Sequence, residues 1–219
     1  MRNPDKFFDS PSHQAGFTLI ELVIVLVIIG LILGAVLKGQ QMVENGKIKN
    51  IINDLQGISV AYHAYHDRYQ AIPGDDAQAA AHFTGGIAGD GDGMIAGLFA
   101  ATDAPGIGAE SNNFWQHLRL SGFLTGSGSN PANHSLNGVL GVQGAVVTYG
   151  MTGNVVCAGS IPQKIAQAVD IQLDDGDSAT GTLRAGVAGA SNQATVPATS
   201  TAYGAAAPAD TLHTLCMKL

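Results

Sequence analysis

Charged residues are scarce in this chain: Asp, Glu, Lys and Arg together make up 12% of its 219 residues. The 10 basic residues are outnumbered by 17 acidic ones, which gives a formal net charge of −7. Nucleic-acid binding depends mainly on clustered Lys and Arg against phosphate. The composition therefore predicts no nucleic-acid partner, and it favours either a surface of small residues or extensive contacts between subunits.

Cysteine is nearly absent as well, with Cys157 and Cys216 as the only two. They have no CxxC spacing, which excludes the common zinc motifs. If this part of the chain is exported, an oxidising compartment favours a single Cys157–Cys216 disulfide. The alternative is a pair of buried free thiols.

Familiar catalytic motifs are also missing. The sequence contains no GxSxG, no P-loop and no HExxH, so it lacks the usual nucleophile elbow, phosphate-binding loop and metalloprotease zinc site. We therefore expect a protein that is not an enzyme and that requires no cofactor.

The chain does contain one long apolar run, residues 17–37, whose only polar side chains are Thr18 and Glu21. At about 1.5 Å per residue, such a helix is about 30 Å long and matches the hydrocarbon core of a bilayer. A secretory signal peptide has a shorter apolar region followed by an A-x-A-like site, and this run does not fit that pattern. The run predicts a single membrane-spanning helix.

Glu21 is the informative residue within this run, because a carboxylate inside a membrane costs about 2.5–3.5 kcal/mol. Its nearest candidate partner is a new amino terminus at Phe17, which exists only if the chain is cut after Gly16. The alternative is a carboxylate that is simply lifted to the headgroup region.

The segment GFTLIE at residues 16–21, followed by the apolar run, resembles the processing site of type IV prepilins and of the pseudopilins of type II secretion. The resemblance implies that a membrane-bound prepilin peptidase removes residues 1–16 as a leader, cutting after Gly16, and methylates the new terminus at Phe17. Glu21 matches the family's glutamate at the fifth mature position, which serves in assembly. An incoming subunit would place its Phe17 amine beside Glu21 of a subunit already in the filament, which compensates both charges.

The sequence becomes amphipathic after Lys38, and Pro73 and Gly74 end the pattern. It predicts one helix over about residues 17–70, in which residues 17–38 span the membrane. Residues 39–72 are the amphipathic continuation, with one face packed on a head domain. The apolar positions that recur at threes and fours are Val43, Ile48, Ile51, Ile52, Leu55, Ile58, Tyr62, Tyr65 and Tyr69.

Residues 73–219 form the predicted head, which gives an α+β fold with a long N-terminal helix packed on a small antiparallel sheet with short helices. Two short helices are expected at residues 112–124 and just after Pro162, and the stretch 188–210 is expected to be an exposed loop. By the resemblance, a disulfide commonly bounds the C-terminal region of pilins. The expected strands are Val139–Tyr149, Gly153–Cys157 and Thr182–Val187.

Two acidic clusters in the head are candidates for calcium, the one ion considered. Asp90 and Asp92 resemble the start of an EF-hand loop, and Asp174, Asp175 and Asp177 form a second cluster. By the resemblance, major pseudopilins bind calcium in a head loop. The alternative is a pair of acidic turns without an ion.

The sequence thus favours a structural subunit of a type IV pilus-like filament, with identical or related subunits as partners. Before assembly it would sit in the bacterial inner membrane by a single span, with its head in the periplasm. One alternative is a pseudopilin of the periplasmic type II secretion piston. Another is an adhesin or ligand-binding head displayed on a filament.

Overall fold

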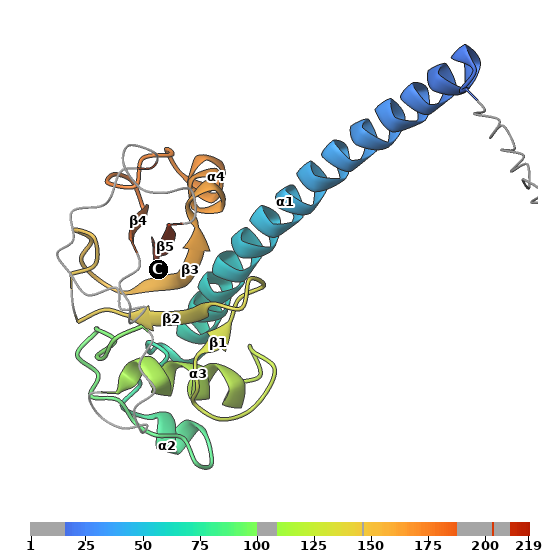
Figure 1. Cartoon of the computed structure of the whole chain (residues 1–219). Helices are drawn as coiled ribbons and strands as arrows, with labels where there is room; N and C mark the ends of the chain where they lie inside the picture. Colours follow the sequence, from blue (N-terminus) through green and yellow to red (C-terminus); the bar gives the residue numbers. More distant parts are fainter. Residues whose placement is uncertain (1–15, 100–108, 146, 188–202, 204–210) are drawn as a thin grey trace, which may run out of the picture. The chain divides into compact units, whose positions relative to one another are not determined.

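The computed structural model describes residues 16–99, 109–145, 147–187, 203 and 211–219 (Figure 1). The chain divides into two compact units, Met1–Val43 and Glu44–Leu219, and each is described by itself. Except for Gly16, the expected leader lies outside the described residues. The expected loop at 188–210 does so too, except for Tyr203.

Helix α1 runs without interruption over the 51 residues Leu19–Tyr69 and contributes to both units. Its length follows from the apolar and amphipathic runs and from the lack of proline between residues 17 and 72. It ends at Tyr69, because the following residue Gln70 has a left-handed φ of 53° and its N–H donates to the carbonyl of His66 at 2.8 Å. The buried residues follow the predicted spacing of three and four: Ile48, Ile51, Leu55, Ile58, Ala61, Tyr62 and Tyr65.

Five antiparallel strands of the described residues form one sheet in the order β1-β2-β3-β5-β4. The C-terminal strand β5 therefore lies between β3 and β4 rather than at an edge. The predicted α+β fold with a small antiparallel sheet is confirmed. The strands are β1 Ala132–Asn133, β2 Val139–Gln143, β3 Val155–Pro162, β4 Leu183–Val187 and β5 Leu212–Lys218.

All three predicted strands have different bounds in the structure, although β4 differs only in starting at Leu183 rather than Thr182. Strand β2 stops at Gln143, because the N–H of Gly144 leaves the ladder and donates to the carbonyl of Ile95 at 2.8 Å. Strand β3 continues past Cys157 to Pro162, with a register shift between Ala158 and Ile161 at which Ser160 has a φ of 59°. Such a shift is a β-bulge, which lets the strand bend without ending.

The two faces of the sheet contact different hydrophobic clusters. Val156, Ala158 and Leu215 face the main core, which also contains the buried residues of α1. Val155, Cys157 and Cys216 belong to a second cluster with Phe99, Tyr149 and Met151. Because side chains alternate between the faces of a strand, the disulfide lies on the face opposite the main core.

Three short helices complete the described head: α2 Ala79–His82, α3 Glu110–Leu120 and α4 Gln163–Leu173. Helix α3 starts before the predicted residue 112 and ends before 124, because Gly122 turns the chain with a φ of 79°. Helix α4 starts directly after Pro162, as the proline signal predicts.

Candidate functional site

The candidate assembly site is the start of α1, where Thr18 and Glu21 bind each other reciprocally. Oε2 of Glu21 accepts hydrogen bonds from the backbone N–H and from the hydroxyl of Thr18, each at 2.8 Å. The Thr18 hydroxyl oxygen in turn accepts the N–H of Glu21 at 3.3 Å. This is a capping box, in which a Thr before the helix and a Glu three residues later satisfy orphan N–H groups of the first turn.

Only one of the two carboxylate oxygens of Glu21 is committed to this cap. Among the described residues, Oε1 has no hydrogen-bond partner. Glu21 also lines a hollow of about 530 Å³ together with Phe17, Leu22, Ile24 and Val25. Phe17, the expected processed terminus, is 84% exposed and lies directly before the cap. The site therefore offers one open carboxylate oxygen beside a hollow of otherwise apolar side chains.

The part of α1 that belongs to the unit Met1–Val43 has no buried face. Every residue from Gly16 to Val43 is exposed, and the apolar side chains from Leu19 to Leu37 are at least 45% exposed where they are large. A helix that is apolar all round requires an apolar environment, either lipid or other helices. By length and composition, α1 contains one stretch that could cross a membrane.

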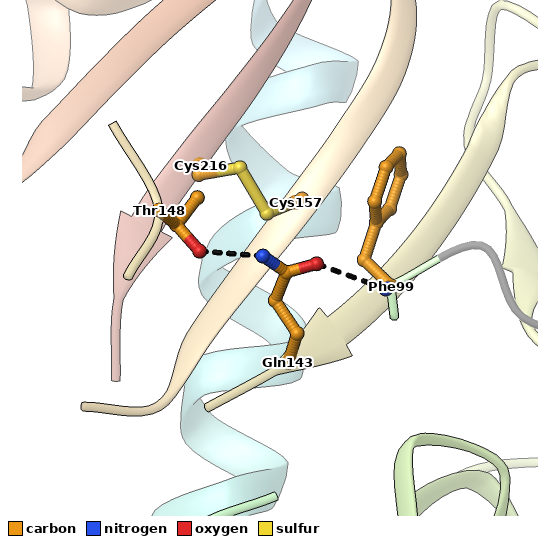
Figure 2. The surroundings of a disulfide bond; sticks show 5 residues. All are labelled: Phe99, Gln143, Thr148, Cys157 and Cys216. Carbon is orange, nitrogen blue, oxygen red and sulfur yellow. Dashed lines mark hydrogen bonds between the residues drawn. A yellow bond between two sulfur atoms is a disulfide. The ribbon is translucent and has the colours of Figure 1, made fainter. Parts of the chain in front are cut away.

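The second predicted feature, the disulfide, joins Cys157 of β3 to Cys216 of β5, which are direct partners in the ladder (Figure 2). Both cysteines are completely buried. Beside them, Gln143 accepts the N–H of Phe99 at 3.1 Å and donates to the Thr148 hydroxyl at 2.5 Å. This amide links the backbone at Phe99 to the side chain of Thr148 beside the disulfide.

Of the two residues of the first predicted calcium cluster, Asp90 lies in a group with two other acidic residues and Asp92 does not. Carboxylate oxygens of Asp75, Asp90 and Glu110 lie within 4.8 Å of one another, while Asp92 instead accepts the N–H of Met94 at 2.8 Å. Carboxylate oxygens are the ligands that calcium prefers, so the donor set fits that ion. Asp75 and Glu110 are buried, and burial raises the pKa of both carboxyl groups.

Backbone N–H groups already bind the two buried carboxylates of this group. Asp75 accepts the N–H groups of Gly91, Asp92 and Gly93 at 2.6, 3.1 and 2.8 Å. Glu110 accepts those of Asp90 at 3.0 Å and Ala96 at 2.9 Å. These contacts order the loop 89–96 around the carboxylates.

The second acidic group also differs in membership from the predicted cluster. It consists of Asp170, Asp174 and Asp175, with oxygens within 4.8 Å, and does not include Asp177. Asp170 is fully buried and accepts the hydroxyl of Tyr203 at 2.9 Å. Burial raises the pKa of Asp170 despite this hydrogen bond.

A buried polar network beside α1 was not predicted. Asp76 accepts the Tyr65 hydroxyl at 2.7 Å and the Gln78 N–H at 2.7 Å, and it lies 2.8 Å from Nδ1 of His82. Burial acts to raise the pKa of Asp76, but these three contacts outweigh it and hold the pKa below its ordinary value. The network ties the end of α1 to α2.

Three segments that are separated in the sequence, 69–76, 89–95 and 114–118, contribute to this region. The structure brings them together: Asp75 binds the N–H groups of 91–93, and His117 binds Gly74 at 2.9 Å. A Cβ at Gly74 would lie 3.2 Å from the backbone nitrogen of Phe114, and one at Gly89 would collide with the backbone of Asp75. These glycines are therefore required by close backbone approach.

Comparison with known proteins identifies the segment that contains the candidate assembly site at the start of α1. Residues 11–37 match the family described as the prokaryotic N-terminal methylation motif. This motif is the hallmark of type IV pilins and pseudopilins, a structural and non-enzymatic class, so the chain carries the N-terminal segment of that class. The chain matches no curated protein and no solved structure.

Proposed function

We propose that this chain is a structural subunit of a type IV pilus-like filament, cut after Gly16 by prepilin peptidase and polymerised through its N-terminal helix. The observation that carries the proposal is the exposed apolar stretch 19–37, interrupted by one carboxylate with one oxygen open. The methylation motif over residues 11–37 supports the processing step.

The free energy of moving a helix out of lipid explains how subunits could select which helices to pack against, and in which register. Transfer from lipid to a bundle of identical helices gains little hydrophobic free energy, because lipid tails are as apolar as leucine. A charge pair in a medium of low dielectric is far stronger than in water. The Phe17 amine of one subunit and Oε1 of Glu21 in its neighbour would therefore determine which helices pack and in which register.

We also propose that the unit Glu44–Leu219 lies in the periplasm while α1 anchors the subunit in the bacterial inner membrane. The Cys157–Cys216 disulfide supports this orientation, since disulfides persist in oxidising compartments and are rare in the cytosol. We assign the chain no catalytic role, in keeping with the structural class of its N-terminal segment.

Deletion of this chain from its host distinguishes the pilus-subunit hypothesis from the pseudopilin hypothesis. A pilus subunit should appear in filaments sheared from the cell surface, and its deletion should leave secretion of exported enzymes unchanged. Absence from the sheared filaments together with loss of enzyme secretion would replace the proposal by the pseudopilin. A display role would instead leave filaments intact on deletion but abolish their adhesion to surfaces.

Calcium binding remains a separate proposal for the head. If the group around Asp90 holds the ion, calcium should raise the melting temperature of the full-length chain, and Asp90→Asn should abolish the shift. Asp174→Asn is the matched control, because it reports on the second group. A melting temperature that calcium leaves unchanged in the unsubstituted chain would contradict binding at either group.

A further inference from the structure

His117 is completely buried, and its two ring nitrogens bind backbone groups before and after α2. Nδ1 accepts the N–H of Gly74 at 2.9 Å, and Nε2 lies 2.8 Å from the carbonyl oxygen of Ile87. A backbone N–H can only donate and a carbonyl oxygen can only accept. The ring is therefore neutral, with its proton on Nε2.

His134 repeats this arrangement in a different part of the head. It is 3% exposed, its Nδ1 accepts the N–H of Leu136 at 3.1 Å, and its Nε2 lies 2.7 Å from the carbonyl oxygen of Gly159. The same donor and acceptor logic fixes the neutral form with the proton on Nε2. A Cβ at Gly138 would collide with this ring and with the Gly159 carbonyl, so the turn closes tightly over the imidazole.

We propose that His117 and His134 are two proton-sensitive clamps: the neutral rings hold the segment 74–87, which includes α2, and the turn 134–138, and protonation releases both segments. A proton added to Nδ1 places an N–H against the N–H of Gly74 or of Leu136. The ring then loses one hydrogen bond and gains a repulsive contact. A buried imidazolium would also lack the solvation that a charge requires.

The charged and titratable groups around His117 come from three elements. The Tyr65 ring of α1 is stacked on the imidazole at 5.9 Å, Asp76 follows α1, and His82 belongs to α2. Asp76 favours the imidazolium and a protonated His82 opposes it. Burial is the largest influence, and it lowers the pKa of His117 although the bond to Ile87 acts to raise it.

Within the described part of the chain, His134 faces one charged group, Asp54 of α1, whose carboxylate accepts the N–H of Ser135 at 3.0 Å. Asp54 favours the imidazolium, but burial outweighs it and lowers the pKa of His134. Because an unfolded histidine has a pKa of about 6.5, each clamp is intact above that pH and weakens as the pH falls below it. The head of an exported subunit would thus loosen at two separate places in mild acid.

Amide hydrogen exchange on the full-length chain in detergent tests the proposal. Between about pH 7.5 and about pH 5.5, opening of 74–87 and of 134–138 should rise roughly tenfold for each pH unit below the unfolded histidine pKa. His117→Gln should remove the pH response of 74–87 only, and His134→Gln that of 134–138 only. Comparison of variants at the same pH cancels the intrinsic pH dependence of exchange.

His66→Gln is the control, because His66 is exposed on α1 and should change neither segment. A pH response that persists in the matching Gln variant would overturn the proposal for that segment. Should a Gln variant not fold, titration of the imidazole signals in the unsubstituted chain decides the matter. Both rings should titrate with a pKa below that of an unfolded histidine. A pKa at or above that value would equally overturn the proposal.

Discussion

Glu21 and Thr18 satisfy each other at the start of α1, with the carboxylate bound by both the N–H and the hydroxyl of Thr18 at 2.8 Å. This pair gives Glu21 two separable properties. It is the Glu of a capping box, for which any side-chain oxygen would serve, and it is a negative charge with one oxygen open. A substitution can remove either property without the other.

Glu21→Gln should block filament assembly almost as completely as Glu21→Ala. The glutamine oxygen can still accept from Thr18 and so keep the cap, but it cannot compensate the charged Phe17 amine of a neighbouring subunit. Membrane fractionation should show both variants inserted at unchanged levels, while the sheared filament fraction is lost.

Thr18→Val is the complementary variant, because it removes the capping hydroxyl and retains the charge. Loss of an N-cap costs about 1 kcal/mol of helix stability, so this variant should assemble with reduced yield rather than not at all. Normal filaments formed by Glu21→Gln would show that the charge is dispensable, and the assembly mechanism proposed above would fail.

Gly16→Ala should prevent removal of residues 1–16, since the resemblance places the cut directly after this glycine. Intact mass of the membrane-extracted protein should then correspond to the full chain, with no methyl group on Phe17. Gly34→Ala is the control, because a Cβ at that position meets nothing within 4 Å, and its mass should match the processed form. An unsubstituted chain whose mature form begins at Met1 would contradict the cleavage site itself.

The sequence predicted α1 because its periodicity extends over many turns, but it did not predict β5. Four consecutive residues of that strand, from His213 to Cys216, are buried. A strand buried on both faces shows no alternation of apolar and polar residues. Its central position, between β3 and β4, is what removed the signal.

The candidate sites also include some contacts that the sequence predicts and others that it does not. Thr18 and Glu21 are three residues apart, so local spacing alone indicates their contact. Asp75 accepts a hydrogen bond from Gly91, which lies in a separate segment, and Glu110 of α3 lies in the same acidic group. Such a group depends on how three separate segments pack, and Asp90 was the only member that local spacing identified.

Loss of the disulfide should lower the stability of the head by about 2–5 kcal/mol. The double variant Cys157→Ala/Cys216→Ala should show this loss in urea denaturation followed by the fluorescence of Trp115, which is the only tryptophan and is buried. Reduction of the unsubstituted chain should lower its stability to a similar extent. Equal stability of the oxidised chain and the double variant would show that the strand pairing of β3 and β5 alone suffices.

Tyr65→Phe should destabilise the head by about 1.5–3 kcal/mol at neutral pH, because it removes a charge-assisted hydrogen bond to a buried carboxylate. The folded pKa of Asp76 lies below its unfolded value, so this contribution is present above the unfolded pKa of about 3.9 and is lost as the pH falls through the folded pKa. The difference between Tyr65→Phe and the unsubstituted chain should therefore shrink in strong acid.

Tyr62→Phe is the matched control for this experiment. Tyr62 is also buried on α1, and no described residue is a hydrogen-bond partner of its hydroxyl, so its variant should stay within about 0.5 kcal/mol of the parent at every pH. Urea denaturation of the three full-length proteins, read by Trp115 at neutral pH and at about pH 3, measures both effects. If Tyr65→Phe costs no more than Tyr62→Phe at neutral pH, the bond to Asp76 contributes nothing, and α1 is tied to α2 by ring packing alone.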